Sequence, residues 1–580
     1  MSKFPNPGSR YPAAQITAIA RLWGNRSQSW RPARFRNWGW GMGLLLLCAC
    51  RSRPAHQQQV FRCNIVEGIT TLDPAFAKSQ AIIWAVHQLY STLVEPDSQM
   101  VIRPGLAIRW EESADHLTYT FYLRPDVYFH DNEAFPDGKG RRLTAHDVVY
   151  SFRRLMNPAT ASPGAWVFNG KVDPDKGFKA LNDSVFQLTL LQPFHPILGI
   201  LSMQYCSIVP REVVEKYGQD FRRHPCGTGP FLFHQWEEGQ ALILHRNPRY
   251  FEKDAQGRPL PYLDAVKMTF LDNKATEFLL FRQGQLDFMN DLDASFKDEV
   301  LTKTGQLKKK WAGKMVLAKS PYLNVEYLGF LLDSSKPVVQ QSPTRLKKVR
   351  QAINYGFDRV KLMTYLRNSI GTPAGAGFVP RGLPSFDAEK VKGYRYNPSL
   401  ARQLLAEAGF PQGRGLPELR LLTIPMYADL ANYIANQVQE IGVRIQVEVV
   451  QKSLLLEQTA KSAALFFRGT WIADYPDAES YLAFFYGKNP APPNYTRYTN
   501  PAYDRLYEQA LQETNDSLRY EMYRAMDRMI VEDAPVVPVF YDEAVHFLQP
   551  YVQGMRNNGL NLLELRWVTV RKQAAGTINY

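Results

Sequence analysis

The residues from 468 to 480, RGTWIADYPDAES, bring a basic side chain, an indole and three carboxylates into one short stretch. The preceding residues, AALFF, are apolar enough to form a buried strand. Asp474 is therefore expected where a buried strand emerges. A carboxylate at such a place either is a solvated loop end or anchors a positively charged group, because an unpaired buried charge is costly.

The common catalytic motifs do not occur in the sequence. The ten histidines form neither HExxH nor HxH, and neither the G-x-S-x-G elbow nor the GxxxxGK[ST] phosphate loop occurs. The stretch DGKG at 137–140 is too short for a nucleotide loop, and His130 lies at the end of a predicted strand, where a structural role is expected. An exported peptidase is the alternative from another class, but we do not expect an enzyme.

Length and charge limit the other classes. A chain of 580 residues is too long for one hydrophobic core, so two to four domains or lobes are expected. The net charge of +14 suggests nucleic-acid binding, but Lys3 and six arginines all precede position 50, where no acid occurs. The remaining body is mildly basic with interspersed acids, and nucleic acid is therefore not an expected partner.

The N-terminal segment has the three parts of a secretory signal. Basic residues lead into WGWGMGLLLLCAC, in which residues 44–47 form a short apolar core. The final LCAC resembles the bacterial lipobox, which places a lipid-modified cysteine at Cys50. We expect a signal peptide over 1–49, a lipid-anchored linker over 50–57, and a monomeric, exported body at the periplasmic or outer face of a bacterial membrane. An ordinary signal peptide or a buried apolar patch remains the alternative.

Cysteine usage indicates neither a metal nor a redox site. Beyond Cys50 and its neighbour Cys48, only Cys63, Cys206 and Cys226 occur, without a CxxC pair. Cys206 and Cys226 could pair in an oxidising compartment, but two separate buried thiols are the expected state. No cofactor is expected.

The apolar pattern then predicts the elements that position these residues. Helical spacing predicts a helix near residues 82–90, and alternation predicts a strand over 117–129. The stretch LTAHDVVYSFRRLM predicts a helix with Thr144 as N-cap and Asp147 three residues later.

The C-terminal half has the order strand, helix, strand. A helix is expected from Asn397 to Gly409, with Pro in its first turn and Gly just past its end. Residues 418–424, 428–442 and 443–450 then predict a βαβ unit, which builds parallel sheets. The fold class is therefore α/β.

Six blocks resemble, in order, motifs of the extracellular solute-binding proteins of peptide and nickel ABC transporters. They are YTFYLRPDVYFHDNEAF…LTAHDVVYSFRRL (119–155), GTGPF with HRNPRYF (227–251), KKVRQAINYGFDR (347–359), WIADYPDAESYL (471–482), YTNPAYDRL (498–506) and EDAPVVPVFY (532–541). Each block alone is weak, but six in order span most of the chain after Cys50.

The resemblance implies a periplasmic-binding-protein-like fold, with two hinged α/β lobes and a third lobe inserted in the first. Such proteins close over an extended peptide and deliver it to ABC permease subunits in the membrane. The motif order gives lobe I as 58–95, 225–315 and 535–575, inserted lobe II as 96–224, and lobe III as 316–534.

The resemblance also implies roles for single residues. In peptide-binding members, the acid of the W-x-x-D-Y block pairs with the ligand's α-ammonium, which assigns that role to Asp474 and the aromatic position to Trp471. Ile472 and Tyr475 belong to the same block and are expected beside the ligand. Arg468 coincides with a basic residue that binds the ligand carboxylate in some relatives.

Each of these roles has a structural alternative. Asp474 could cap the helix that begins near Pro476 or pair internally, Trp471 could be core, and Arg468 could pair with a neighbouring acid. Asp477 and Glu479 are expected to be solvated or capping residues. A nickel chelate, haem, an oligosaccharide or another small solute remains the alternative to a peptide ligand.

The lipobox leads to the first prediction. Cells fed a labelled fatty acid should incorporate the label into the wild-type protein, and Cys50→Ser should abolish it, because the lipid is attached through that thiol. Equal labelling of both proteins would contradict the site.

Overall fold

The computed structural model describes residues 58–571. The predicted signal peptide, the linker and Cys50 lie outside the described residues. Within the described part of the chain, every helix is too short or too polar to cross a membrane.

A four-stranded sheet forms the first layer. Its order is β1-β10-β9-β8, with β1 parallel to β10 and the other neighbours antiparallel. Helix α1 (Gln80–Leu89) packs near β8 with an almost wholly buried face, and the predicted helix at 82–90 is thereby confirmed. The strands are β1 (Val60–Asn64), β8 (Phe231–Glu237), β9 (Ala241–Arg246) and β10 (Ala265–Thr269).

A second, antiparallel sheet has the order β4-β5-β7-β6, and α2 (Ala145–Met156) packs against β6 and β7. The predicted cap of α2 is confirmed, because Thr144 and Asp147 form a reciprocal capping box. The strands are β4 (Ala107–Glu112), β5 (Thr118–Leu123), β6 (Phe178–Asn182) and β7 (Val185–Thr189), and helices α3 (Ile197–Leu201) and α4 (Arg211–Tyr217) follow.

The predicted strand over 117–129 is wrong in its second half. β5 ends at Leu123, and a turn at Pro125 and Asp126 follows. Proline has no N–H to donate to a sheet ladder, so strand pairing stops there. The alternation of apolar residues continues beyond that point, which is why the sequence predicted a longer strand.

The third and largest sheet has the order β11-β17-β12-β16-β14-β15, with β13 beside β17. The predicted βαβ unit is confirmed, since β14 and β15 are parallel and α11 connects them. The strands are β11 (Phe288–Asn290), β12 (Val316–Phe330), β13 (Thr372–Pro373), β14 (Leu419–Thr423), β15 (Ile445–Val449), β16 (Phe466–Ile472) and β17 (Val536–Leu548).

Most of the remaining helices belong to the chain around this sheet. Helix α10 begins after its predicted cap, Asn397, whose side chain accepts a hydrogen bond from Leu400 N. The remaining helices are α5 (Lys274–Arg282), α6 (Ala294–Val300), α7 (Pro337–Gln341), α8 (Lys347–Tyr355), α9 (Arg359–Arg367), α10 (Pro398–Glu407), α11 (Ala428–Gln439), α12 (Lys452–Ala460), α13 (Glu479–Leu482), α14 (Pro501–Gln512) and α15 (Asp516–Asp533). The short strands β2 (Val94–Pro96), β3 (Ile102–Pro104), β18 (Val552–Gln553) and β19 (Thr569–Val570) form two small antiparallel pairs, β2 with β3 and β18 with β19.

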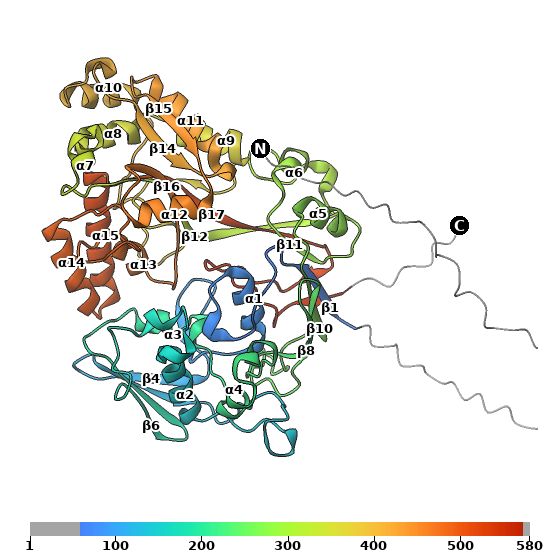
Figure 1. Ribbon diagram of the computed structural model, residues 1–580. Coiled ribbons are helices and arrows are strands. Elements are labelled where there is room, and N and C mark those ends of the chain that lie inside the picture. The colour runs from blue at the N-terminus through green and yellow to red at the C-terminus, as the bar shows by residue number, and fades with distance from the viewer. Residues whose placement is uncertain (1–57, 572–580) are drawn as a thin grey trace, which may run out of the picture. The chain divides into compact units, whose positions relative to one another are not determined.

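Two long strands, β12 and β17, run beside each other along this sheet (Figure 1). Residues 325–329 of β12 pair with the first half of β17, and residues 316–321 pair with its second half. The register shifts between Pro321 and Val325. The expected boundaries assign β17 to lobe I and β12 to lobe III, so the pairing of these strands joins the two expected lobes. The boundaries themselves stay a prediction.

The three described cysteines, Cys63, Cys206 and Cys226, are buried free thiols. Cys206 and Cys226 therefore do not form a disulfide bond, in agreement with the expected state of two separate buried thiols. Cys226 Sγ donates a hydrogen bond to His130 O at 3.3 Å.

The GTGPF block fits closely against the end of α1. Gly229 N donates to Leu89 O at 3.0 Å, and a Cβ on Gly229 would lie 2.4 Å from the Leu89 carbonyl carbon. A Cβ on Gly227 would lie 2.2 Å from Leu89 O. Only glycine allows the two backbones to approach this closely.

Gly229→Ala should therefore lower the free energy of unfolding by about 1–3 kcal/mol, because backbone atoms must move to admit the methyl group. Urea unfolding measures this loss. Gly375→Ala is the matched control, since its nearest neighbour would lie 4.0 Å away. Equal stability of the two variants would contradict the close approach.

Candidate functional site

A cavity of about 280 Å³ lies where six separate segments of the chain meet. Its walls come from the chain around the start of α1, from Trp166 and from the residues that follow α3. They are completed by Tyr322 in the middle of β12, by the end of β16 and by the segment after β17. The lining residues are Ala77, Lys78, Gln80, Ile83, Trp166, Ser202, Met203, Gln204, Tyr205, Tyr322, Ile472, Ala473, Asp474, Leu560 and Leu562.

The end of β16 carries the acid that the sequence singled out. Ile472 is the last residue of the strand, pairs with Asn324 of β12 and is 46% exposed. Ala473 N donates to Leu323 O at 2.9 Å, which continues the hydrogen bonding to β12 for one residue beyond the strand. Asp474 therefore leaves the sheet at a fixed point and lines the cavity together with Ile472.

The Asp474 carboxylate has no hydrogen bond or ion pair with any residue that the structure describes. Its side chain is exposed to the cavity, while its backbone N–H donates to Ser480 Oγ at 3.2 Å. Crowding by protein atoms and the nearby Glu479 raise the pKa of Asp474 to about 6. Burial and the Asp474 carboxylate likewise raise the pKa of Tyr205 to about 12.

Residues beside Asp474 have the structural roles that were the alternatives for it. Helix α13 begins at Glu479, and Asp477 Oδ1 accepts the Glu479 N–H at 2.8 Å, so Asp477 has the capping role. Glu479 was expected to be a solvated or capping residue, but it is buried. It accepts hydrogen bonds from the hydroxyls of Tyr475 and Tyr507.

Arg468 lies inside the sheet and does not line the cavity. It is 7% exposed and makes a two-pronged ion pair with the fully buried Glu326 of β12, with Nη2 2.5 Å from Oε2. Its guanidinium also stacks 3.7 Å from the centre of the Tyr427 ring. Burial opposes the positive charge, but Glu326 outweighs it, and the pKa of Arg468 is raised. The structure thus has the internal pairing that the sequence left open.

Trp471 and Tyr475 also sit beside the cavity rather than in its lining. Trp471 Nε1 donates to Ser480 O at 2.7 Å, and its ring packs edge-on against Phe484. Tyr475 is 5% exposed and contacts Glu479. Of the five expected ligand-binding residues, Asp474 and Ile472 line the cavity in this structure.

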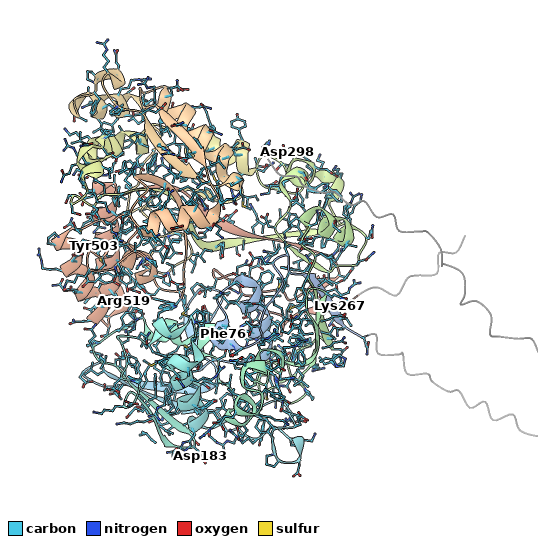
Figure 2. The ribbon with its side chains drawn as sticks, viewed as in Figure 1. Phe76, Asp183, Lys267, Asp298, Tyr503 and Arg519 are labelled. Carbon is cyan, nitrogen blue, oxygen red and sulfur yellow. The ribbon has the colours of Figure 1, made fainter. Side chains whose placement is uncertain are left out.

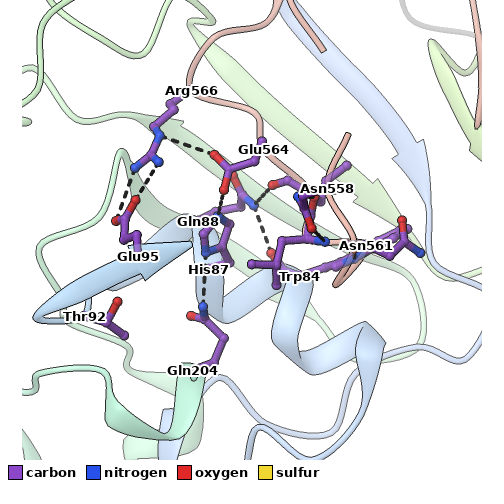
Figure 3. Close-up of polar contacts among 12 residues, drawn as sticks. Trp84, His87, Gln88, Thr92, Glu95, Gln204, Asn558, Asn561, Glu564 and Arg566 are labelled. Carbon is purple, nitrogen blue, oxygen red and sulfur yellow. Dashed lines mark hydrogen bonds and ion pairs between the residues drawn. The ribbon is translucent and has the colours of Figure 1, made fainter. Parts of the chain in front are cut away.

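A polar network connects α1 with Gln204 and with the segment after β17 (Figure 3). His87 Nε2 lies 2.6 Å from Glu564 Oε1, and Gln204, which lines the cavity, lies 3.2 Å from His87 Nδ1. Burial disfavours the imidazolium, but Glu564 beside it outweighs this effect and raises the pKa of His87. Trp84 Nε1 donates to Asn561 O at 2.6 Å. These bonds tie α1 to the segment that carries Leu560 and Leu562, and no sequence pattern predicted them.

A larger hollow of about 670 Å³ lies over Glu95 and Arg566. Its buried charges already satisfy one another, since Arg566 Nη2 lies 2.6 Å from Glu95 Oε2 and Arg566 Nε lies 3.3 Å from Glu564 Oε2. None of the five expected ligand-binding residues lines it. Within residues 58–571, no group of three or more His, Cys, Asp or Glu side chains is placed to hold a metal ion.

Comparison with known proteins identifies the relatives of the chain. The family model described as bacterial extracellular solute-binding proteins, family 5 Middle, matches residues 101–493. The chain is 27% identical to the probable deoxycholate-binding periplasmic protein YgiS of Escherichia coli, over 86% of this chain and 91% of the relative. It is 26% identical to the periplasmic oligopeptide-binding protein OppA of Salmonella typhimurium, over 86% and 90%.

A solved structure agrees with these matches. The periplasmic binding protein DppA from Helicobacter pylori, in complex with the peptide STSA, superposes with a TM-score of 0.70 at 25% identity. The superposition covers 89% of this chain and 98% of that one.

The position of Arg468 leads to a stability prediction. Glu326→Gln leaves the buried guanidinium without a counter-charge and should lower the free energy of unfolding by about 3–5 kcal/mol. Urea unfolding gives the value for this variant, for Arg468→Met and for the double variant.

The double variant is the control, because it removes the unpaired charge as well as the pair. It should be more stable than the sum of the single losses predicts. Additive losses would mean that Glu326 and Arg468 do not hold each other in solution.

Proposed function

The chain belongs to family 5 of the bacterial extracellular solute-binding proteins, which serve ABC importers, and we propose that its ligand is a peptide held through its α-ammonium by Asp474. The Asp474 carboxylate carries this proposal, because it faces the cavity without a partner among the described residues. A peptide ammonium must lose water on entering such a cavity, and a carboxylate within hydrogen-bond reach offsets that loss.

Deoxycholate, the ligand in the name of the relative YgiS, fits this cavity less well. Deoxycholate is an amphipathic carboxylate without an ammonium, and it would leave Asp474 without a counter-charge. The apolar lining from Ile83, Met203, Ile472 and Leu562 suits either ligand, and the charge of Asp474 supports the peptide.

Closure around the ligand is the second part of the proposal. The cavity walls come from all three expected lobes, and β12 and β17 join lobe I to lobe III. The register shift between Pro321 and Val325 is a natural place for the two segments to bend. We infer that the lobes open and close about these strands, as in other proteins that bury a ligand by hinge motion.

Anchoring and delivery complete the proposal. A lipid on Cys50 would hold the protein at a membrane surface, where permease subunits of an importer would receive the released peptide. One short acyl chain gives only marginal membrane binding, so a cysteine that carries several chains is the expected anchor.

Replacement of Asp474 tests the ammonium contact. Asp474→Asn keeps the shape of the side chain and should weaken binding by about 2–5 kcal/mol, or roughly 30-fold to several thousand-fold. Calorimetric titration with the tightest-binding member of a peptide mixture measures the loss. The affinity of the wild type should also fall as the pH drops through about 6, because protonation removes the Asp474 charge while the ammonium keeps its own.

An N-acetylated copy of the same peptide makes the complementary change. If the two groups meet, acetylation should cost far less on Asp474→Asn than on the wild type. Asp183→Asn is the control, since this carboxylate is exposed at a site far from the cavity lining. Additive losses would mean that Asp474 does not hold the ammonium.

A further inference from the structure

Two charged side chains line the cavity, and they have opposite signs. Among the described residues in its walls, Lys78 is the single base and Asp474 the single acid. Lys78 lies between a short 3-10 helix (Pro74–Phe76) and the start of α1, while Asp474 follows β16. The two groups therefore approach the ligand space from different segments.

The Lys78 ammonium has no partner in the structure as described. Its side chain is exposed, and it makes no ion pair or hydrogen bond with any residue from 58 to 571. Lys78 and Asp474 do not pair with each other, so the cavity holds one unneutralised charge of each sign.

The basic residue expected to bind a ligand carboxylate is occupied elsewhere. Arg468 is buried against Glu326 and lies outside the cavity lining. Any carboxylate that enters the cavity therefore meets Lys78 as its one cationic wall residue within the described chain.

We propose, on the basis of the proposed peptide-binding function, that Lys78 binds the terminal carboxylate of the ligand and that the ligand is a short zwitterionic peptide held at both ends. An ammonium and a carboxylate at the two ends of one ligand neutralise Asp474 and Lys78 together. A charged partner strengthens each hydrogen bond in a site from which water has been displaced.

The dimensions of the cavity limit the ligand. At about 280 Å³ it lies at the lower end of the roughly 300–1,000 Å³ found for pockets that bind small molecules. A space of this size suits a peptide of about two or three residues better than a longer one. Its side chains contact apolar groups, among them Ile83, Met203 and Leu560.

Retention from defined mixtures tests the proposal. The wild type is incubated with two equimolar mixtures of random di-, tri- and hexapeptides, one with free carboxylates and one with C-terminal amides. Mass spectrometry of the retained fraction should show di- and tripeptides from the free-acid mixture. Calorimetry with the best-retained peptide should show that amidation weakens binding about 10- to 100-fold, the usual range for one charged hydrogen-bond partner.

Two lysine variants locate the effect. Lys78→Met should weaken binding of the free-acid peptide by a similar factor and should bind the amide no worse than the wild type does. Lys267→Met is the matched control, because Lys267 is an exposed lysine on β10, well separated from Phe76 near Lys78 (Figure 2). Thermal unfolding checks that both variants are folded.

The possible failures can be told apart. Retention of amides as well as free acids, retention of hexapeptides alone, or an amidation penalty that persists in Lys78→Met would overturn the role of Lys78 and leave the ammonium contact of Asp474 standing. Retention of neither mixture by the folded wild type would overturn the peptide-binding function itself, and the inference with it.

Discussion

The pairing of β12 with its two neighbours is the constraint on which the candidate site depends. β12 lies between β17 and β16, and its register with β16 sets Asn324 opposite Ile472. A slip of one residue would turn every side chain of β16 to the other face of the sheet. Ile472 would then leave the cavity, and Asp474 would emerge at a different place.

The buried pair of Arg468 and Glu326 reinforces this register. The two residues lie on neighbouring strands and meet inside the sheet, where both charges are shielded from water. Such a pair adds little net stability compared with apolar residues, but a shifted register would leave both charges unpaired. We infer that the pair acts mainly by excluding other registers. Arg468 lies four residues before Ile472, the end of the strand that lines the cavity.

Local pattern predicted the elements better than it predicted the partners of single residues. The capping box of α2 and the βαβ unit of β14, α11 and β15 depend on residues a few positions apart, and both were predicted. The end of β5 was missed because apolar alternation continues through a segment that proline removes from the ladder.

The site residues divide in the same way. Asp474 was found because it follows a buried strand inside a recognisable block. The partner of Arg468 was not found, because Glu326 lies 142 residues away in sequence and only the sheet brings them together. Lys78 gave no signal of its own, since a lysine before a helix usually points to solvent. Its position in the cavity wall depends on how six distant segments meet.

This dependence on distant segments connects ligand binding with the arrangement of the lobes. Segments assigned to the expected lobes II and III contact each other, since His195 N donates to Leu511 O at 3.3 Å and Tyr475 lies against Gly199. A ligand that contacts Lys78, Tyr205 and Asp474 at once can do so only while all these walls are together. Its binding energy therefore stabilises that arrangement over any state in which the walls separate. With the walls apart, Lys78 and Asp474 would be solvated individually, so the two charges would favour the proposed closure only when a ligand of both signs lay between them.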